Sequence, residues 1–202
     1  WTALPTQAEM GSLAAAAASA YGAGVPVLPV AGAQAAIQLV PRLAPPGLAR
    51  VLAPTYNEHR ASLESAGWRV EAVESTEALA GADLAVVVNP NNPDGRRHTP
   101  ESLRALAGRT GLLVVDESFA DPYPDLSLAP SIRAEDNVVV LRSFGKFYGL
   151  AGLRLGFVVA GTEHVAALRE MAGPWAVSGP AIAVGTAALG DADWRRRTTA
   201  RL

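Results

Sequence analysis

The fold of this chain is decided by residues 138–159, VVVLRSFGKFYGLAGLRLGFVV. Two continuous apolar runs, Val138–Leu141 and Leu155–Val159, flank a turn-rich segment. Such runs are typical of strands that are buried on both faces of a parallel sheet. Lys146 lies between them and is the only lysine in the chain, beside sixteen arginines. An amine can lose its proton and add to an aldehyde, whereas a guanidinium cannot, so the segment predicts a chemical role for Lys146.

Further apolar runs alternate with helical stretches along the chain. The other expected strands are Ala49–Ala53, Arg69–Val73, Leu84–Val88 and Leu112–Val115. Residue types that cap helices stand between the strands. They predict helix starts at Thr6, at Thr99 before Pro100 and at Thr162, and helix ends at Gly22 and Gly67. This alternation predicts an α/β fold with three layers, α/β/α, and a mostly parallel sheet.

Composition excludes several classes of function. The chain has no cysteine, which removes disulfides, thiolate metal sites and cysteine nucleophiles. Its formal net charge is -2, so nothing favours nucleic acid or an anionic membrane surface as a partner. Neither a Gly-Lys-Ser/Thr phosphate loop nor a G-x-G-x-x-G fingerprint is present, which makes a nucleotide-binding α/β protein a weak alternative.

The stretch Met10–Pro41 carries no charged side chain. Its glycines and prolines divide it into pieces too short to span a bilayer, and no signal peptide is expected at the start. We therefore expect a protein of the cytoplasm. The chain begins with Trp1 and ends in helix-like sequence, so both ends are expected to be cut.

Polar residues follow four of the expected strands. In a parallel α/β sheet, ligands bind beyond the carboxyl ends of the strands, so these residues are candidates for a site. The four segments are residues 54–56, 89–95, 116–119 and 142–146.

Three of these segments carry a family resemblance. Residues 143–157 are similar to the cofactor-lysine motif of the class I/II aminotransferase-like enzymes, the fold-type I pyridoxal 5'-phosphate (PLP) family. Residues 91–95 resemble the family's Asn-Pro-x-Gly turn, and residues 115–117 resemble its Asp-Glu strand end. The motifs occur in the family's order and spacing, and the similarity runs over essentially the whole chain.

The resemblance implies a role for each matching residue. Lys146 would hold PLP as a Schiff base and later move protons, and Asp116 would keep the pyridine nitrogen protonated. The cofactor phosphate would be bound by Ser143, Arg154 and the start of a helix at Gly32, Ala33 and Gln34. Tyr56 would stack on the ring and Asn92 would bond its phenolic oxygen. Many relatives have Tyr where this chain has Phe119, which argues against an ordinary transaminase.

Within the family, the chain is most similar to the branch that holds histidinol-phosphate aminotransferase and the L-threonine O-3-phosphate decarboxylase of cobalamin biosynthesis. Residues 29–37, 141–147 and 173–180, together with Phe119, resemble the decarboxylase side. The resemblance therefore implies a PLP-dependent lyase that forms (R)-1-amino-2-propanol phosphate. The alternatives are an aminotransferase of the histidinol-phosphate type and a truncated PLP-fold protein without catalysis.

The resemblance also implies an organisation and partners. Residues 1–178 would form the large PLP-binding domain, and residues 179–202 would begin the connection to a small C-terminal domain. The partners would be a small phosphorylated amino acid and a second copy of the chain, because the family builds its active site at a two-fold interface.

Overall fold

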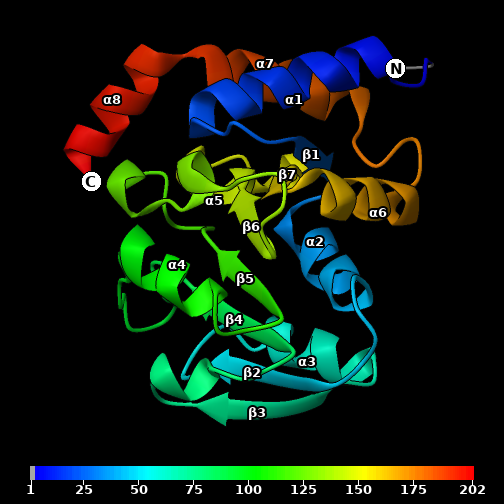
Figure 1. Ribbon diagram of the computed structural model, residues 1–202. Coiled ribbons are helices and arrows are strands. Elements are labelled where there is room, and N and C mark those ends of the chain that lie inside the picture. Colours follow the sequence, from blue (N-terminus) through cyan, green and yellow to red (C-terminus); the bar gives the residue numbers. More distant parts are fainter. Residues whose placement is uncertain (1–2) are drawn as a thin grey trace.

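A seven-stranded sheet forms the centre of the molecule (Figure 1). The computed structural model describes residues 3–202. The strands are β1 (Val27–Val30), β2 (Leu48–Leu52), β3 (Arg69–Val73), β4 (Leu84–Val88), β5 (Leu112–Asp116), β6 (Val138–Ser143) and β7 (Gly156–Ala160), in the order β1-β7-β6-β5-β4-β2-β3. Strands β2 to β6 pair in parallel, and β7 pairs antiparallel with both β6 and β1. The mostly parallel α/β sheet is therefore confirmed.

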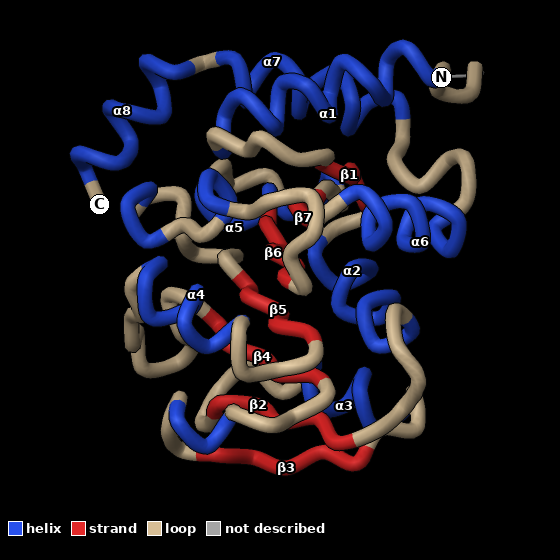
Figure 2. The backbone as a smooth tube through the Cα atoms, in the orientation of Figure 1, coloured by secondary structure: helices blue, strands red, loops and turns tan. Residues whose placement is uncertain are grey.

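Helices cover both faces of this sheet (Figure 2). They are α1 (Gln7–Tyr21), α2 (Ala33–Leu39), α3 (Glu58–Ser65), α4 (Pro100–Ala107), α5 (Phe144–Phe147), α6 (Thr162–Ala172), α7 (Gly179–Gly190) and α8 (Ala192–Arg201). Short 3-10 helices lie at Val40–Arg42, Glu77–Leu79, Pro124–Leu126, Ala129–Ser131 and Ala151–Leu153. Helices α2, α3 and α6 contribute to the hydrophobic cluster on one face, and α1, α4, α5 and α7 contribute to the cluster on the other.

Local sequence explains most of the helix ends. Thr6 and Glu9 form the expected capping box of α1, and Gly22 ends that helix in the left-handed conformation with φ 64°, where a Cβ is unfavourable. The Thr99 side chain caps α4 ahead of Pro100. The cap of α6 is Gly161 rather than the expected Thr162, which is the first residue of the helix.

Two strand expectations were wrong in detail. Residues Val27–Val30 form β1, which the sequence analysis did not identify, because this short run contains Pro29 and stands among Ala and Gly. Strand β3 was expected to be buried on both faces, yet it lies at the edge of the sheet and its Arg69, Glu71 and Ala72 are exposed. The predicted strand Leu84–Val88 agrees with β4 at both ends, and the ends of the other predicted strands lie within two residues of the observed ones.

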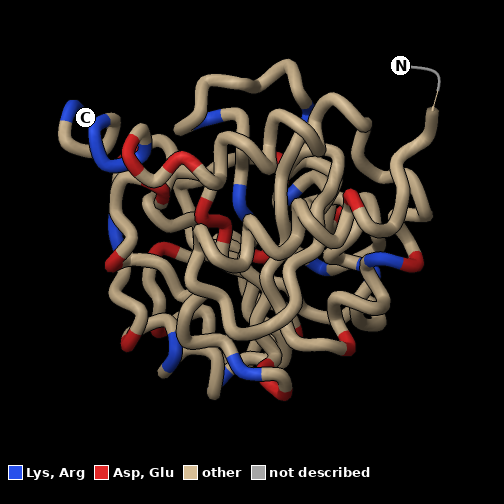
Figure 3. Tube along the Cα trace, turned by 90° about the horizontal axis from the view of Figure 1, so that it is seen from above, with Lys and Arg blue, Asp and Glu red and all other residues tan. Residues whose placement is uncertain are grey.

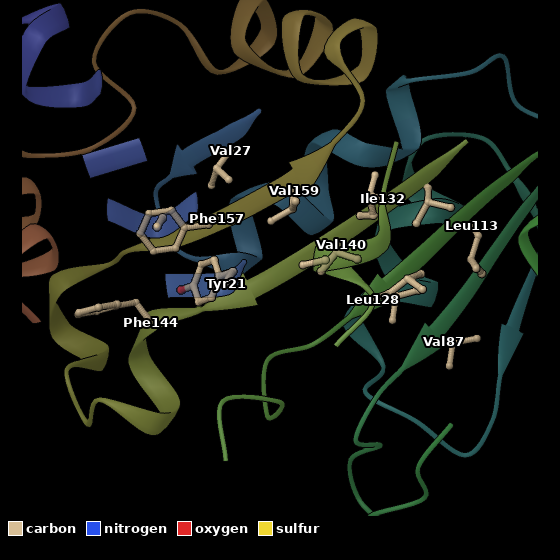
Figure 4. Packing of buried hydrophobic residues seen from close by; sticks show 14 of the residues in the cluster. Tyr21, Val27, Val87, Leu113, Leu128, Ile132, Val140, Phe144, Phe157 and Val159 are labelled. Atoms are coloured by element: carbon tan, nitrogen blue, oxygen red, sulfur yellow. The ribbon is translucent and has the colours of Figure 1, made fainter. Parts of the chain in front are cut away.

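The lysine-bearing turn is anchored in the core on one side of the sheet (Figure 4). Phe144 begins α5 and is fully buried, with its ring edge-on to Phe157 of β7 and stacked on Tyr148 at 4.3 Å. These contacts fix both ends of the turn, so the backbone that carries Lys146 is held by packing.

The last two helices pack against this same face. Helix α7 lies along α1, and Gly185 allows the approach because a Cβ there would lie 3.1 Å from Leu13 of α1 and 2.5 Å from Leu155. Helix α8 then turns away from this pair (Figure 1). The predicted domain boundary at residue 178 stays a prediction. Within residues 3–202, none of the helices is long and apolar enough to cross a membrane.

Candidate functional site

A cavity of about 180 Å³ opens at the carboxyl ends of the parallel strands. All nine residues that the sequence analysis proposed for a site line it. They are Gly32, Ala33, Gln34, Tyr56, Asn92, Asp116, Ser143, Lys146 and Arg154. These residues come from parts of the chain up to 122 positions apart in the sequence, from Gly32 to Arg154, so the sheet topology is what brings them together.

Lys146 lies on the single-turn helix α5, directly after β6. Its Nζ atom lies 5.6 Å from the centre of the Phe119 ring, which also lines the cavity. Among residues 3–202, its amine makes no hydrogen bond or ion pair. The amine is thus exposed beside an aromatic face and is accessible to a ligand in the cavity.

Asp116 ends β5 as a buried carboxylate with three hydrogen bonds. One oxygen lies 2.8 Å from Nε2 of His59, and the other accepts from the Ser118 hydroxyl at 2.6 Å and the Ser118 amide at 2.9 Å. Burial by itself raises the pKa of Asp116, but the bonds to His59 and Ser118 outweigh it and hold the pKa below the usual value. Asp116 therefore presents a fixed negative charge at this end of the cavity.

A second part of the cavity lining is suited to bind an anion. It consists of Ser143, the Arg154 side chain and the first residues of α2. The first N–H groups of a helix have no acceptor within the helix and attract negative charge. Gly32 precedes α2 with φ 80°, and a Cβ there would lie 2.7 Å from Nη2 of Arg154. Only glycine lets the guanidinium approach this backbone so closely.

Arg154 itself has an unusual backbone. Its φ of 50° and ψ of 55° place it in the left-handed region, which costs a non-glycine residue about 1 kcal/mol or more. The guanidinium also donates to the Ala151 carbonyl at 3.2 Å. The turn after α5 is therefore strained at the residue whose side chain lines the cavity.

Tyr56 and the two asparagines form the rim. The Tyr56 ring lies edge-on to His59 at 6.2 Å, and its hydroxyl is 3.5 Å from Oε1 of Gln34. Asn91 is already bonded within the protein, because its side chain accepts from the Thr55 hydroxyl and donates to the Pro54 carbonyl and to Asp94. Asn92 is exposed and lines the cavity, so it is the asparagine that is able to reach a ligand.

The two residues that hold Asp116 were not assigned by the sequence analysis: His59 was not named, and Ser118 stood in the candidate segment 116–119 without a role. His59 lies on α3, which follows β2, and it reaches Asp116 across 57 residues of sequence. The available signal was weak: His59 stands three residues after Tyr56, a spacing that puts both on one side of a helical turn. Ser118 gave a clearer signal, since a serine two residues after an aspartate is able to bond it locally.

A second buried network lies beside these residues. Glu117 and Arg142 each neighbour a cavity residue in sequence, and they pair with each other at 2.8 Å. Arg142 also binds Asp121 at 2.8 Å. Within residues 3–202, no group of three His, Asp or Glu side chains could hold a metal ion. The cavity combines an amine, an anion site and a buried carboxylate.

Comparison with known proteins gives this arrangement a context. The family described as aminotransferase class I and II matches residues 5–201. A threonine-phosphate decarboxylase from Sinorhizobium sp is 47% identical over 196 residues, which is 94% of this chain and 59% of that protein. The threonine-phosphate decarboxylase of Pseudomonas aeruginosa is 44% identical, over 100% of this chain and 62% of that protein. The chain thus spans about three fifths of the length of these relatives.

The chain is also similar to solved structures of an aminotransferase and a decarboxylase, and to a further aminotransferase. Histidinol-phosphate aminotransferase from Sinorhizobium meliloti, in complex with pyridoxal-5'-phosphate, superposes with a TM-score of 0.87 at 26% identity, over 96% of this chain and 58% of that chain. L-threonine-O-3-phosphate decarboxylase from Porphyromonas gingivalis has the same fold, with a TM-score of 0.79 at 24% identity, over 91% of this chain and 62% of that chain. Histidinol-phosphate aminotransferase from Symbiobacterium thermophilum is 38% identical over 143 residues, which is 67% of this chain and 39% of that protein.

Proposed function

The chain belongs to the aminotransferase class I and II family, and we propose that it is the PLP-binding part of an enzyme that decarboxylates L-threonine O-3-phosphate. The observation that carries the substrate is the identity of 47% and 44% with two threonine-phosphate decarboxylases over 94% and 100% of the chain. The most similar aminotransferase among the reported relatives is 38% identical and matches 67% of the chain.

The residues of the cavity fit PLP. A phosphate matches Arg154, Ser143 and the start of α2, where the glycine backbone at Gly32 leaves no room for a Cβ. A protonated pyridine nitrogen matches Asp116, the buried carboxylate of the cavity lining. An aldehyde requires an accessible amine, and Lys146 supplies it in the same cavity.

Bound PLP supplies a protonated ring that withdraws electrons from the α-carbon of an attached amino acid. Asp116 would accept the N–H of the ring and keep the proton on that nitrogen, and His59 and Ser118 keep Asp116 ionised. Arg154 and Ser143 would bind the phosphate and so hold the cofactor in the cavity. Tyr56 would cover the ring, and Asn92 would bond its phenolic oxygen.

Lys146 would hold the cofactor through its aldehyde and, once the substrate amine has displaced it, would be free to move protons. In decarboxylation the α-carbon loses CO2 and gains one proton, and the Lys146 amine is the accessible group in the described site that is able to deliver it. Phe119 places an aromatic face beside this amine, at 5.6 Å from Nζ, and offers no hydroxyl to it or to the cofactor. A hydrogen-bond donor is therefore absent at position 119.

An aminotransferase of the histidinol-phosphate type is the second candidate. It is supported by the superposition on the Sinorhizobium meliloti enzyme, whose TM-score of 0.87 exceeds the 0.79 of the decarboxylase structure. We give this less weight, because related enzymes with different reactions share one fold.

Product analysis separates the candidates. The full-length protein is incubated with PLP and L-threonine O-3-phosphate, and separately with histidinol phosphate and 2-oxoglutarate, beside Lys146→Ala as the control. We expect the wild-type protein to release CO2 from the first mixture and Lys146→Ala to release none. Glutamate from the second mixture without CO2 from the first would establish the aminotransferase instead. If neither product forms and the wild-type protein gains no visible absorbance with PLP, the chain is a non-catalytic member of the family.

We also propose that two copies of the chain associate. Trp175 is 58% exposed, in the loop between α6 and α7, and an exposed tryptophan is a residue type enriched at interfaces. Light scattering on the full-length protein tests this, and an active monomer would refute it.

A further inference from the structure

A second cavity lies beside the first on the face of the sheet that carries α1, α5 and α8. Its volume is about 670 Å³, within the range of small-molecule sites. It shares no lining residue with the cavity around Lys146. The two cavities meet at α5, because Lys146 lines the first whereas Phe147 and Tyr148 line the second.

Unpaired polar atoms concentrate on this second cavity. Residues 3–202 contain six buried side-chain polar atoms that have no hydrogen-bond partner, and four of them belong to residues that line it. They are Oδ2 of Asp121, Nε of Arg142, the hydroxyl of Tyr148 and Nη1 of Arg195. Buried polar groups are nearly always paired, so this clustering indicates partners from outside residues 3–202.

The groups on the sheet side are held rigidly. Arg142 is fixed by Glu117 and Asp121, each at 2.8 Å, and its guanidinium lies 4.4 Å over the Tyr21 ring. The side chains of Arg142 and Asp121 are only 4% and 6% exposed. The ion pairs and the burial hold both side chains in place. Nε of Arg142 and Oδ2 of Asp121 therefore keep their positions without a partner among residues 3–202.

The groups on the α8 side are ordered by stacking. The Tyr148 ring lies between Phe144 and Trp194, at 4.3 Å and 5.5 Å, and is nearly parallel to both. Burial raises the pKa of Tyr148, and Asp121 raises it further while Arg195 and Arg142 oppose. The hydroxyl therefore keeps its proton at neutral pH, and all four groups lie within range of one another's charge.

The charges of the cavity balance. Asp121, Arg142, Arg195 and Arg196 line it, and Glu117 and Asp193 pair with Arg142 and Arg196. The cluster therefore has three carboxylates and three guanidiniums and is formally neutral. The arginines of α8 gather at the C-terminal end of the molecule (Figure 3). A simple anion would be repelled by Asp121, and a simple cation by the arginines. A ligand that carries a positive and a negative group is able to pair with Asp121 and with the arginines at the same time.

We propose that this cavity binds a compact zwitterion, a small molecule whose ammonium group pairs with Asp121 and whose oxyanion pairs with Arg195 and Arg142. Tyr148 then bonds either pole through its hydroxyl. This site is separate from the cofactor and does not depend on the reaction proposed above.

Calorimetric titration of the full-length protein, saturated with PLP and then reduced with borohydride, tests the site. The probe is O-phosphoethanolamine, and inorganic phosphate and ethanolamine are titrated separately as its two halves. Saturable binding below about 10 mM is expected, with each half at least about tenfold weaker. No saturation, or phosphate alone binding as tightly as the zwitterion, would overturn the proposal.

Variants then locate the binding. Arg195→Gln is expected to weaken binding of O-phosphoethanolamine by about tenfold or more, and Tyr148→Phe, which keeps the aromatic stack, by about threefold to tenfold. Arg197→Gln is the matched control, because it removes the same charge from an exposed position of α8 that does not line the cavity. Equal binding by the wild-type protein and Arg195→Gln would assign the binding to another place and overturn the proposal.

Discussion

Replacement of His59 by leucine tests whether the buried His59–Asp116 pair stabilises the fold. Leucine approximates the size of the ring but offers no polar atom to Asp116, whose side chain is 4% exposed. A charge-assisted hydrogen bond contributes about 1.5–3 kcal/mol, and an uncompensated buried charge costs about 3–5 kcal/mol. Two hydrogen bonds from Ser118 to Asp116 remain, which favours the lower end of the range for an uncompensated buried charge. We expect the free energy of unfolding at neutral pH to fall by about 3 kcal/mol.

The assay is urea denaturation of the protein without cofactor, followed by circular dichroism, for His59→Leu, Asp116→Asn and the double variant. We expect a coupling energy of about 2 kcal/mol between the two sites. His164→Leu is the control, because His164 is a half-buried histidine whose ring makes no hydrogen bond within residues 3–202, and its effect should stay within about 0.5 kcal/mol. If His59→Leu matches this control, or if the double variant is additive, the pair does not stabilise Asp116.

Three further predictions concern the cofactor site. Lys146→Ala should lose the visible absorbance and the borohydride-reducible link to PLP while its free energy of unfolding changes by less than about 0.5 kcal/mol, because the side chain is exposed; a reducible link in this variant would refute the assignment. Gly32→Ala should weaken PLP binding about tenfold or more in a fluorescence titration, since the new Cβ would lie 2.7 Å from Arg154 and φ is 80°, whereas Gly24→Ala, which meets nothing within 4 Å, should leave it unchanged; equal affinities would show that the close approach is not needed. The lowered pKa of Asp116 means that its ionised form stabilises the fold above its ordinary pKa of 3.8 and that this contribution is lost as the pH falls through the lower folded value. Denaturation between about pH 6 and about pH 3 should therefore show a shallower loss of stability in Asp116→Asn, and parallel curves would contradict the cause given for the shift.

The two cavities show how one strand end serves two environments. Asp116 lines the cofactor cavity, and the next residue, Glu117, belongs to the buried ion pair with Arg142. Successive side chains of extended backbone point to opposite faces, so Asp116 at the end of β5 and Glu117 directly after it reach different sides of the sheet. The same holds for Ser143 and Arg142 at the end of β6. This alternation separates the charge that serves the cofactor from the charges that line the second cavity.

Much of the site could be predicted from the sequence, because its residues stand in short motifs directly after strands. Lys146, Asn92 and Asp116 each follow an apolar run, and the carboxyl ends of parallel strands meet at one edge of a sheet. The bond between His59 and Asp116 could not be predicted in this way. It depends on β2 lying next to β4 and β4 next to β5, and no local pattern records which strands are neighbours.

The sequence by itself determined the fold class, the family and the residues that line the first cavity, since these depend on local periodicity and on motifs with fixed spacing. Only the tertiary structure decided that β7 runs antiparallel between β6 and β1, that β3 is an exposed edge, and that Asp121, Tyr148 and Arg195 face one cavity. Strand direction and long-range contacts are set by how complete elements pack around a shared core, and the free energy of that packing belongs to the whole fold rather than to any one segment.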